Sequence, residues 1–330
     1  GKLDIKASAF GSAGKPVQGA MRADLTGAQL RRKRVNGRED LIELGSGFVT
    51  GEATPEAFTG RLELDAGETG KINGEARVLR SAAALDDMPL RASLRVSTTA
   101  LGFINLYVPD IDRAAGRLDA DLAIGGTVGS PLVNGIVRLR NGELDLYQVN
   151  LALRAAELEA RLIDSGVTFK GSAKAGTGQL TTNGTVQWRN SLPYGDISIR
   201  GEDLLLVNVP EARITASPAL DFKIAGRRID IGGEVRIPPA TIQPADLTGA
   251  VLSSSDELIL GEVPRDPDQS FRIASRVRMV LGEKVTLDTF GLSGRLTGSL
   301  TVDTGVDGIS RGTGELAVAE DVRRVRSDAP

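Results

Sequence analysis

Two residue types are missing from this chain of 330 residues, histidine and cysteine. Without histidine, the chain lacks the usual general base and the commonest metal ligand of proteins. Without cysteine, it has no thiol nucleophile, no thiolate zinc site and no disulfide. The lack of cysteine suits an oxidising compartment, although many cytosolic proteins share it. These two absences narrow the possible chemistry, and we expect no catalytic residues, no metal site and no cofactor.

Aromatic residues and long apolar runs are scarce as well. Aromatics are 4% of the chain against 41% hydrophobic residues, and glycine reaches 40 residues. Aliphatic residues with many glycines suit short strands joined by tight turns. The aliphatic run at 204–207 is among the longest, far below the roughly 20 residues of a membrane span. A net charge of −3 gives no reason to expect nucleic acid as a partner.

Alternation of apolar and polar residues recurs from Gly116 onward. Leu118, Leu122 and Ile124, for example, alternate with Asp119 and Asp121. This period of two predicts strands with one apolar and one solvated face. Turns or bulges are expected at Asn141–Gly142, Asn183–Gly184, Gly125–Gly126, Ser165–Gly166 and Gly232–Gly233, and a strand end at Pro238–Pro239.

Residues 1–97 show a looser pattern. The expected elements there are strands at Leu3–Ala9, Gly60–Leu64 and Leu90–Ser97 and a helical turn at Ser81–Leu85. Further along the chain we expect a short amphipathic helix at Leu101–Val108 and a loop at Gly261–Gln269.

Several charged or aromatic features have a structural and a functional interpretation. The carboxylate pairs Asp110/Asp112, Asp119/Asp121 and Glu157/Glu159 each share a strand face, as a glycosidase requires, but a solvated outer face explains them better. The basic run Arg31–Arg34 fits a solvated loop better than contact with lipid or lipopolysaccharide phosphate. Trp188, the one tryptophan, is expected to pack in a core or groove.

A set of short motifs resembles the TamB family. They are GRLDADLAIGGTVGSP at 116–131 with RNG at 140–142, Ala216–Pro218, IGGEVRIP at 231–238, TIQP at 241–244, SSSDELIL at 253–260 and GLSGRLTG at 291–298. Their order and spacing carry the resemblance over residues 98–320, while residues 1–97 agree with the family only in their general sequence pattern.

The resemblance implies an elongated, curled β-sheet, a taco-like trough with an apolar concave face. It implies a parent protein anchored in the inner membrane that crosses the periplasm, with the anchor outside this chain. It also implies phospholipid acyl chains as cargo, a TamA-like outer-membrane barrel as partner, and a role in outer-membrane protein assembly, with nascent outer-membrane proteins as further candidate partners.

The expected organisation is an N-terminal β-rich segment at 1–97, a connector at 98–116 and a conserved trough at 117–320. The tail at 321–330 loses alternation, and we interpret it as aberrant or frameshifted. The residues expected to line the groove are Leu118, Leu122, Ile124, Ile197, Ile199, Leu220, Phe222, Ile224, Ile229, Ile231, Val235, Ile237, Val277, Met279, Leu281, Leu292, Leu296 and Leu300.

Two other classes of protein compete with this interpretation. A structural or adhesive β-solenoid would show a fixed repeat period, whereas the spacings drift. A carbohydrate-active enzyme would use paired carboxylates without histidine or cysteine, but would usually present aromatic platforms for its sugars.

Overall fold

The described part of the chain is built almost wholly of β-strands. The computed structural model describes residues 1–10, 18–33, 39–99, 101, 111–146, 151–209, 212–238, 240–242, 271–289 and 292–319. Its complete helices in these ranges are two 3-10 turns, η1 at Gly67–Thr69 and η2 at Leu85–Asp87, and Leu101 also has 3-10 conformation. Within the same ranges, no helix is long and apolar enough to cross a membrane. The predicted all-β fold with at most short helical segments is confirmed.

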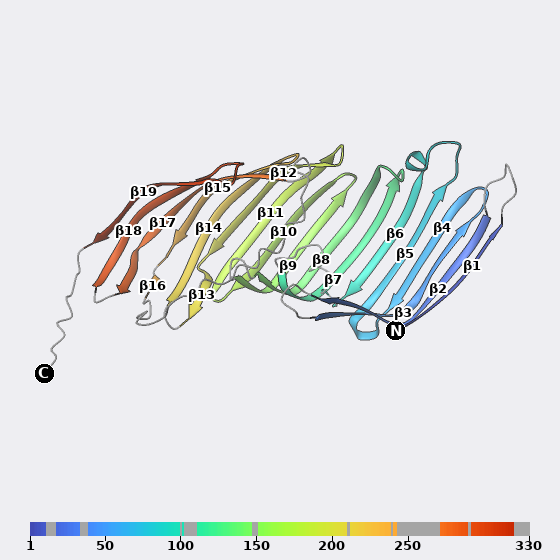
Figure 1. Cartoon of the computed structure of the whole chain (residues 1–330), viewed down its shortest axis with the longest axis horizontal. Helices are drawn as coiled ribbons and strands as arrows, with labels where there is room; N and C mark the ends of the chain where they lie inside the picture. Colours follow the sequence, from blue (N-terminus) through green and yellow to red (C-terminus); the bar gives the residue numbers. More distant parts are fainter. Residues whose placement is uncertain are drawn as a thin grey trace. The chain divides into compact units, whose positions relative to one another are not determined.

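The chain divides into two compact units, Gly1–Gln148 with Leu153–Ala173 and Val149–Ala152 with Lys174–Pro330. The strands of unit 1 are β1 (Lys2–Phe10), β2 (Gln18–Lys33), β3 (Glu39–Ala53), β4 (Ala57–Asp65), β5 (Gly70–Leu79), β6 (Leu90–Thr98), β7 (Ile111–Gly126), β8 (Pro131–Leu146) and most of β9 (Leu151–Ile163) and β10 (Gly166–Ala175) (Figure 1). Those of unit 2 are β11 (Gly178–Arg189), β12 (Leu192–Glu202), β13 (Leu204–Val209), β14 (Ala212–Ala225), β15 (Arg228–Ile237), β16 (Ala240–Ile242), β17 (Arg272–Thr289), β18 (Leu292–Thr304) and β19 (Ser310–Ala319). The organisation expected from the sequence stays a prediction.

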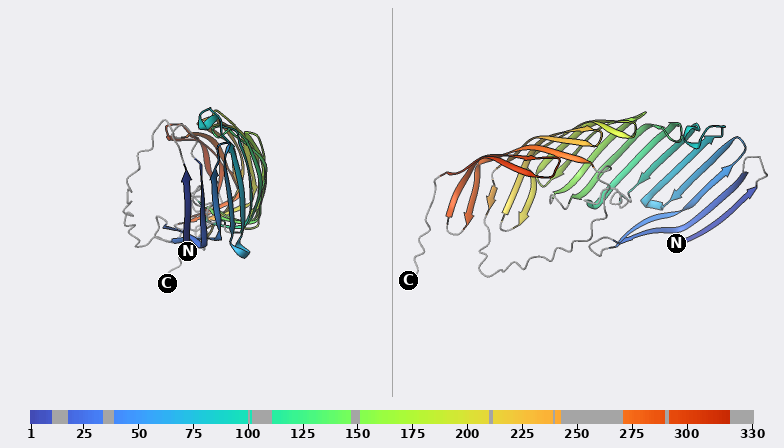
Figure 2. Two further views of the ribbon diagram at one scale, coloured as in Figure 1. Left: turned by 90° about the vertical axis from the view of Figure 1, so that its right-hand side faces the viewer. Right: turned by 45° about the horizontal axis from the view of Figure 1, so that its top comes forward.

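Unit 1 is an antiparallel meander in which each strand from β1 to β8 pairs with the next. β9 lies beside β8, since Arg138 Nε donates to Glu159 Oε2 at 3.1 Å and the Asn141 amide donates to Glu157 Oε1 at 2.9 Å. The strands are visibly bowed, so the sheet of this unit is curled rather than flat (Figure 2).

Unit 2 departs from the simple meander around its long strand β14. One half of β14 pairs with β12 and β15, and the other half with β13 and β16. The changes of partner follow from local chemistry: Asp203, between β12 and β13, has a positive φ of 48°, and proline at 238 ends β15 because it has no amide hydrogen for the ladder. β15 then pairs in parallel with β17, in a register that joins Arg228 to Arg272.

Four local expectations need correction. The helical turn expected at Ser81–Leu85 lies at Leu85–Asp87. Asn183–Gly184 and Gly232–Gly233 are neither turns nor bulges, because they continue the regular pairing of β11 with β12 and of β14 with β15. The basic run is not a loop over its first three residues, since β2 extends to Lys33. The helix expected at Leu101–Val108, apart from Leu101, and the loop at Gly261–Gln269 lie outside the described residues.

Candidate functional site: the apolar faces of the two units

Side chains of opposite character lie on opposite sides of the sheet. In β6, Leu94 and Val96 alternate with Arg95 and Ser97. Successive side chains of a strand point to opposite faces, and residues paired across neighbouring strands point to the same face. The register therefore joins residues of like character into rows that run across the strands.

Unit 1 has three such apolar rows, which together we call the unit 1 apolar face. The rows are Leu3–Leu25–Gly47–Leu64–Ile72–Val96–Ala120–Val137, Ile5–Ala23–Val49–Leu62–Gly74–Leu94–Leu122–Gly135, and Ala7–Met21–Gly51–Gly60–Ala76–Ala92–Ile124–Val133. Each row crosses β1 to β8, a span of about 34 Å at the usual strand spacing.

Unit 2 has a corresponding apolar face, formed mainly by β12, β14, β15, β17 and β18. Its rows include Ile199–Leu220–Gly233–Val277–Val302, Ile197–Phe222–Ile231, Ile224–Ile229–Ile273, Val235–Met279–Leu300 and Ile237–Leu281–Gly298–Leu316. The shift in register between Leu281 and Val285 keeps Val285 and Leu296 on this same face, because it leaves the alternation of both strands in step. We call these rows the unit 2 apolar face.

The predicted groove residues fall on these two faces. Leu122 and Ile124 lie in the rows of the unit 1 apolar face, and Leu118 lies on the same side of β7, between Thr98 and Leu139. Leu292 is the first residue of β18. The others lie together on the unit 2 apolar face: Ile197, Ile199, Leu220, Phe222, Ile224, Ile229, Ile231, Val235, Ile237, Val277, Met279, Leu281, Leu296 and Leu300. Their role as the lining of a groove stays a prediction.

The sequence-based set missed the apolar face of β1 to β6. Ile5, Leu62 and Leu94 belong to it as fully as Leu122, which continues their row on β7. A usable signal was present, because β6 alternates over its whole length. Shorter apolar stretches and many glycines in the preceding strands weakened the pattern.

The apolar faces are not covered by a second layer within the described residues. Within each unit all the described strands belong to one sheet, and they contact chiefly their neighbours in it. Leu3 and Ile5 are 57% and 60% exposed, while Leu62, Leu94, Leu122 and their neighbours are half-buried. The half-burial comes from side chains of one row packing against those of the next.

A shallow apolar depression of about 360 Å³ lies at the β1–β4 end of the unit 1 apolar face. Met21 and Phe58 border it, and Gly19 and Gly51, which have no side chains, form its floor. A Cβ atom added at Gly51 would lie 3.1 Å from Met21 Cγ, so the methionine lies across the glycine. Small residues thus leave room on this face that a large side chain would fill.

Ion pairs cover the opposite, polar faces. Asp119 shows their character: it accepts from the Ser97 hydroxyl at 2.7 Å and pairs with Arg117 and Arg140 at 3.4 and 3.2 Å. The Ser97 hydrogen bond, followed by the charges of the two arginines, lowers the pKa of Asp119 below its usual value. The carboxylate is therefore held ionised.

The carboxylate pairs singled out in the sequence are accounted for by such partners. Asp121 pairs with Arg95, Glu159 pairs with Arg138 and Arg161, and Glu157 accepts the Asn141 amide. The side chains of Asp110 and Asp112 lie outside those described. Within the described part of the chain, no group of three acidic residues is placed to hold a metal ion.

Trp188 is not enclosed in a core, and its packing in a groove stays a prediction. Its side chain is 46% exposed near the end of β11, whereas Val186 on the same face is 7% exposed. Val186 is paired with Gly195 of β12, whereas Trp188 is paired with Pro193 close to the turn between the two strands.

Comparison with known proteins gives matches at the level of sequence. A family model described as "TamB, N-terminal domain" matches residues 1–139, and one described as "TamB C-terminal domain" matches residues 168–320. Among curated proteins, the translocation and assembly module subunit TamB of Haemophilus influenzae is 23% identical over 256 residues. That alignment covers 73% of this chain and 20% of the relative, so the chain spans about a fifth of the length of that protein. No solved structure gives a significant match.

Proposed function

Since this chain belongs to the TamB family, we propose that its apolar faces carry phospholipid acyl chains towards the outer membrane of a diderm bacterium. In this proposal the chain is a periplasmic part of a longer protein anchored in the inner membrane. The partner is a TamA-like outer-membrane barrel, and the supply of lipid supports the assembly of outer-membrane proteins. The name of the relative, a subunit of a translocation and assembly module, fits this role.

The observation that carries the proposal is the run of apolar rows across successive strands with no second layer over them in the described residues. A sheet with one apolar face gains stability when that face is covered, by another layer or by a ligand. Acyl chains match the face chemically, because it offers aliphatic carbon and glycine and hardly any polar atoms.

The free energy of burying an acyl chain on these faces allows the chain both to be bound and to move. Each buried methylene contributes about 0.8 kcal/mol, without any directional contact. Since each apolar row continues from one strand to the next, an acyl chain displaced by one strand finds a similar surface, so the barrier to sliding is small. This function needs no catalytic residue.

Photo-crosslinking tests the proposal directly. A photoreactive amino acid replaces Leu94 or Ile231 on the apolar faces in the parent protein expressed in a diderm bacterium. Lipid adducts are expected at both positions and are identified by mass spectrometry. The matched controls are Arg95, which follows Leu94, and Asp230, which precedes Ile231. Both lie on the opposite face, where few adducts are expected. Equal labelling on both faces would refute the proposal.

A charge on the apolar face separates a lipid surface from a closed core. Ile231→Asp is expected to keep its fold by circular dichroism, because the half-buried position lets the carboxylate reach water. An unpaired charge in a dry core would instead cost several kcal/mol and unfold the unit. The same variant is expected to lose lipid crosslinking at neighbouring Phe222. Normal folding with undiminished crosslinking would contradict the sliding mechanism.

A further inference from the structure

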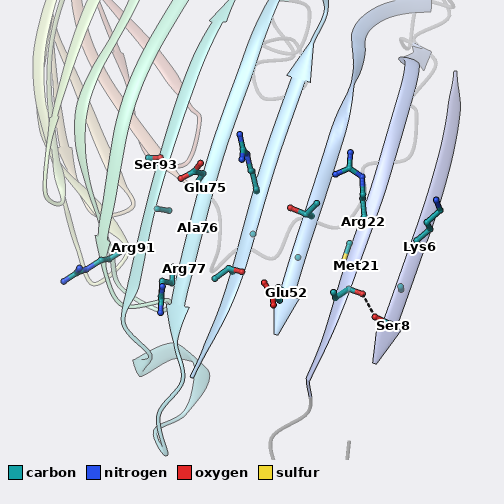
Figure 3. A pocket seen from close by; sticks show the side chains of 18 residues that line it. Lys6, Ser8, Met21, Arg22, Glu52, Glu75, Ala76, Arg77, Arg91 and Ser93 are labelled. Atoms are coloured by element: carbon teal, nitrogen blue, oxygen red, sulfur yellow. Dashed lines mark hydrogen bonds between the residues drawn. The ribbon is translucent and has the colours of Figure 1, made fainter. Parts of the chain in front are cut away.

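A broad cleft of about 830 Å³ crosses unit 1 from β1 to β6. Three successive residues on each of these strands line it, at 6–8, 20–22, 50–52, 59–61, 75–77 and 91–93. Figure 3 shows the lining side chains at one level along the neighbouring strands, with Arg77 and Arg91 on adjacent strands.

The cleft lies on the polar face, opposite the proposed acyl surface. The middle residue of each triplet, such as Ala76 or Ala92, belongs to an apolar row and points away, since successive side chains alternate. The first and third residues form the two walls. If the cleft lay on the apolar face, its walls would be the flanking apolar rows, and Leu62 and Leu94 would line it. Neither does.

Positive charge dominates these walls. Lys6, Arg22, Arg61, Arg77 and Arg91 line the cleft, together with the carboxylates Glu52 and Glu75. Two of the arginines are matched by a carboxylate two residues along their own strand, through the pairs Arg22–Asp24 at 2.7 Å and Arg61–Glu63 at 3.5 Å.

Arg77 and Arg91 differ from Arg22 and Arg61 in having no such ion pair in the described residues. They are direct cross-strand partners, so their Cα atoms are paired and both side chains stand on the same face. Both are exposed, and among the described residues neither has a carboxylate within ion-pair distance. Two like charges directly opposite each other destabilise a sheet. An anion held between them removes that repulsion.

We propose that Arg77 and Arg91 form a binding site for a phosphate group. One guanidinium already saturates the two oxygens of a carboxylate through its fork of N–H donors. Two adjacent forks suit a phosphate, which presents more oxygens and carries more charge. Thr59, opposite Arg77, and Ser93, two residues beyond Arg91 on the same face, add hydroxyl donors at the sides of the pair. The site is independent of the acyl surface, because it lies on the other face of the sheet.

The test is calorimetric titration of the whole protein with inorganic pyrophosphate. Wild-type protein is expected to bind it, and Arg91→Glu is expected to bind at least about tenfold more weakly, through loss of charge-assisted hydrogen bonds. The free variant is expected to melt no earlier than wild type, because a glutamate opposite Arg77 turns a repulsive pair into an attractive one. Lost binding therefore does not reflect lost folding.

Lys2→Glu is the control. It makes the same change of charge on an exposed side chain of β1 outside the cleft, and it is expected to leave the affinity nearly unchanged. Equal weakening by Lys2→Glu and Arg91→Glu would overturn the proposal, because it would show attraction to net charge alone. No binding of pyrophosphate by the wild type would also overturn it.

A second arm identifies the source of the phosphate. Vesicles of phosphatidylcholine with and without phosphatidate are sedimented with the protein. Binding that needs phosphatidate and is lost in Arg91→Glu assigns the site to a lipid headgroup. Binding of pyrophosphate without vesicle binding assigns it to a soluble phosphate. Vesicle binding that survives Arg91→Glu, with no affinity for pyrophosphate, contradicts a phosphate site at this pair.

Discussion

Two aspartates on the polar faces of different units are stabilised in the same way. Asp119 faces Ser97 across β6 and β7, and Asp221 faces Ser198 across β12 and β14. The serine hydroxyl donates to the carboxylate at 2.7 Å in the first case and 2.8 Å in the second. In each case the serine is the largest cause of a lowered pKa, and an arginine adds to it. Each of these hydrogen bonds links two neighbouring strands on their polar, solvent-exposed face.

This lowered pKa makes stability depend on pH in a defined direction. Because the pKa of Asp119 is lower in the folded than in the unfolded chain, its contribution is complete above about pH 4, near the unfolded pKa. The contribution is lost as pH falls through the folded pKa. Asp119→Asn is therefore expected to lower stability at pH 7 and to differ less from wild type as the pH falls below about 4.

Urea unfolding of the wild type and the variant between neutral and acidic pH measures this difference. Ser97→Ala is expected to reproduce part of the effect, because it removes the main cause of the shift. A difference between wild type and Asp119→Asn that stays constant down to the most acidic pH would contradict the assignment.

Two neighbouring glycines in β15 have very different surroundings. Gly233 has a φ of +136°, and a Cβ atom there would lie 2.1 Å from the carbonyl oxygen of Ala219 on β14. Gly232 has no atom within 4 Å of its Cβ position. Only glycine at 233 allows β14 to approach this closely, in a backbone region that other residues rarely adopt.

The two glycines should therefore respond differently to alanine. Gly233→Ala is expected to lower stability by about 1–3 kcal/mol. Gly232→Ala is expected to be neutral or slightly stabilising, because it reduces the freedom of the unfolded chain. Denaturant titration of the pair of variants is sufficient to test this, and equal effects would mean that β14 shifts to make room.

The elements with the clearest alternation were the most predictable from sequence. Residues 229–237 alternate strictly, and β15 spans them, ending where Pro238 predicts. Gly233 was expected to mark a turn or bulge but instead marks a close approach of two strands, which depends on the partner strand and not on local sequence. The parallel pairing of β15 with β17 was not predictable either, because alternation gives the face of a residue but not its partner.

The site was predictable to the same extent. Leu220 and Ile231 could be assigned to one face from their own strands. That Phe222 lies between Ile197 and Ile231 in one row depends on register, which local sequence does not contain. The cleft around Arg77 and Arg91 was missed for the same reason, since these arginines meet only through the pairing of β5 with β6.

At the scale of the whole molecule, stability comes from ladders and rows more than from a dense core. Within the described residues, the buried hydrophobic side chains are few, and Ala57, Ala156, Ala173, Ala175 and Ala216 are among them. Six leucines and valines are also buried, whereas most of the large aliphatic residues on the apolar faces are only half-buried. Less apolar surface is therefore removed from water on folding than in a globular protein of this length.

The heat capacity of unfolding should reflect this. It rises mainly with the apolar surface exposed, and averages about 12–15 cal/mol/K per residue in globular proteins. A lower value per residue is expected for this chain in lipid-free buffer. Scanning calorimetry at several pH values measures it, and a value in the ordinary range would mean that the apolar faces are covered in solution.

The rows also limit how such a sequence can change in length during evolution. An insertion or deletion of one residue inside β5 would move every following side chain of that strand to the other face, placing Glu75 and Arg77 in the apolar rows. A change of two residues would restore the faces and shift the row by one position. Changes in the turns, or the gain and loss of whole hairpins, leave both faces intact. Related chains should therefore differ in length mostly by even steps within strands and freely between them.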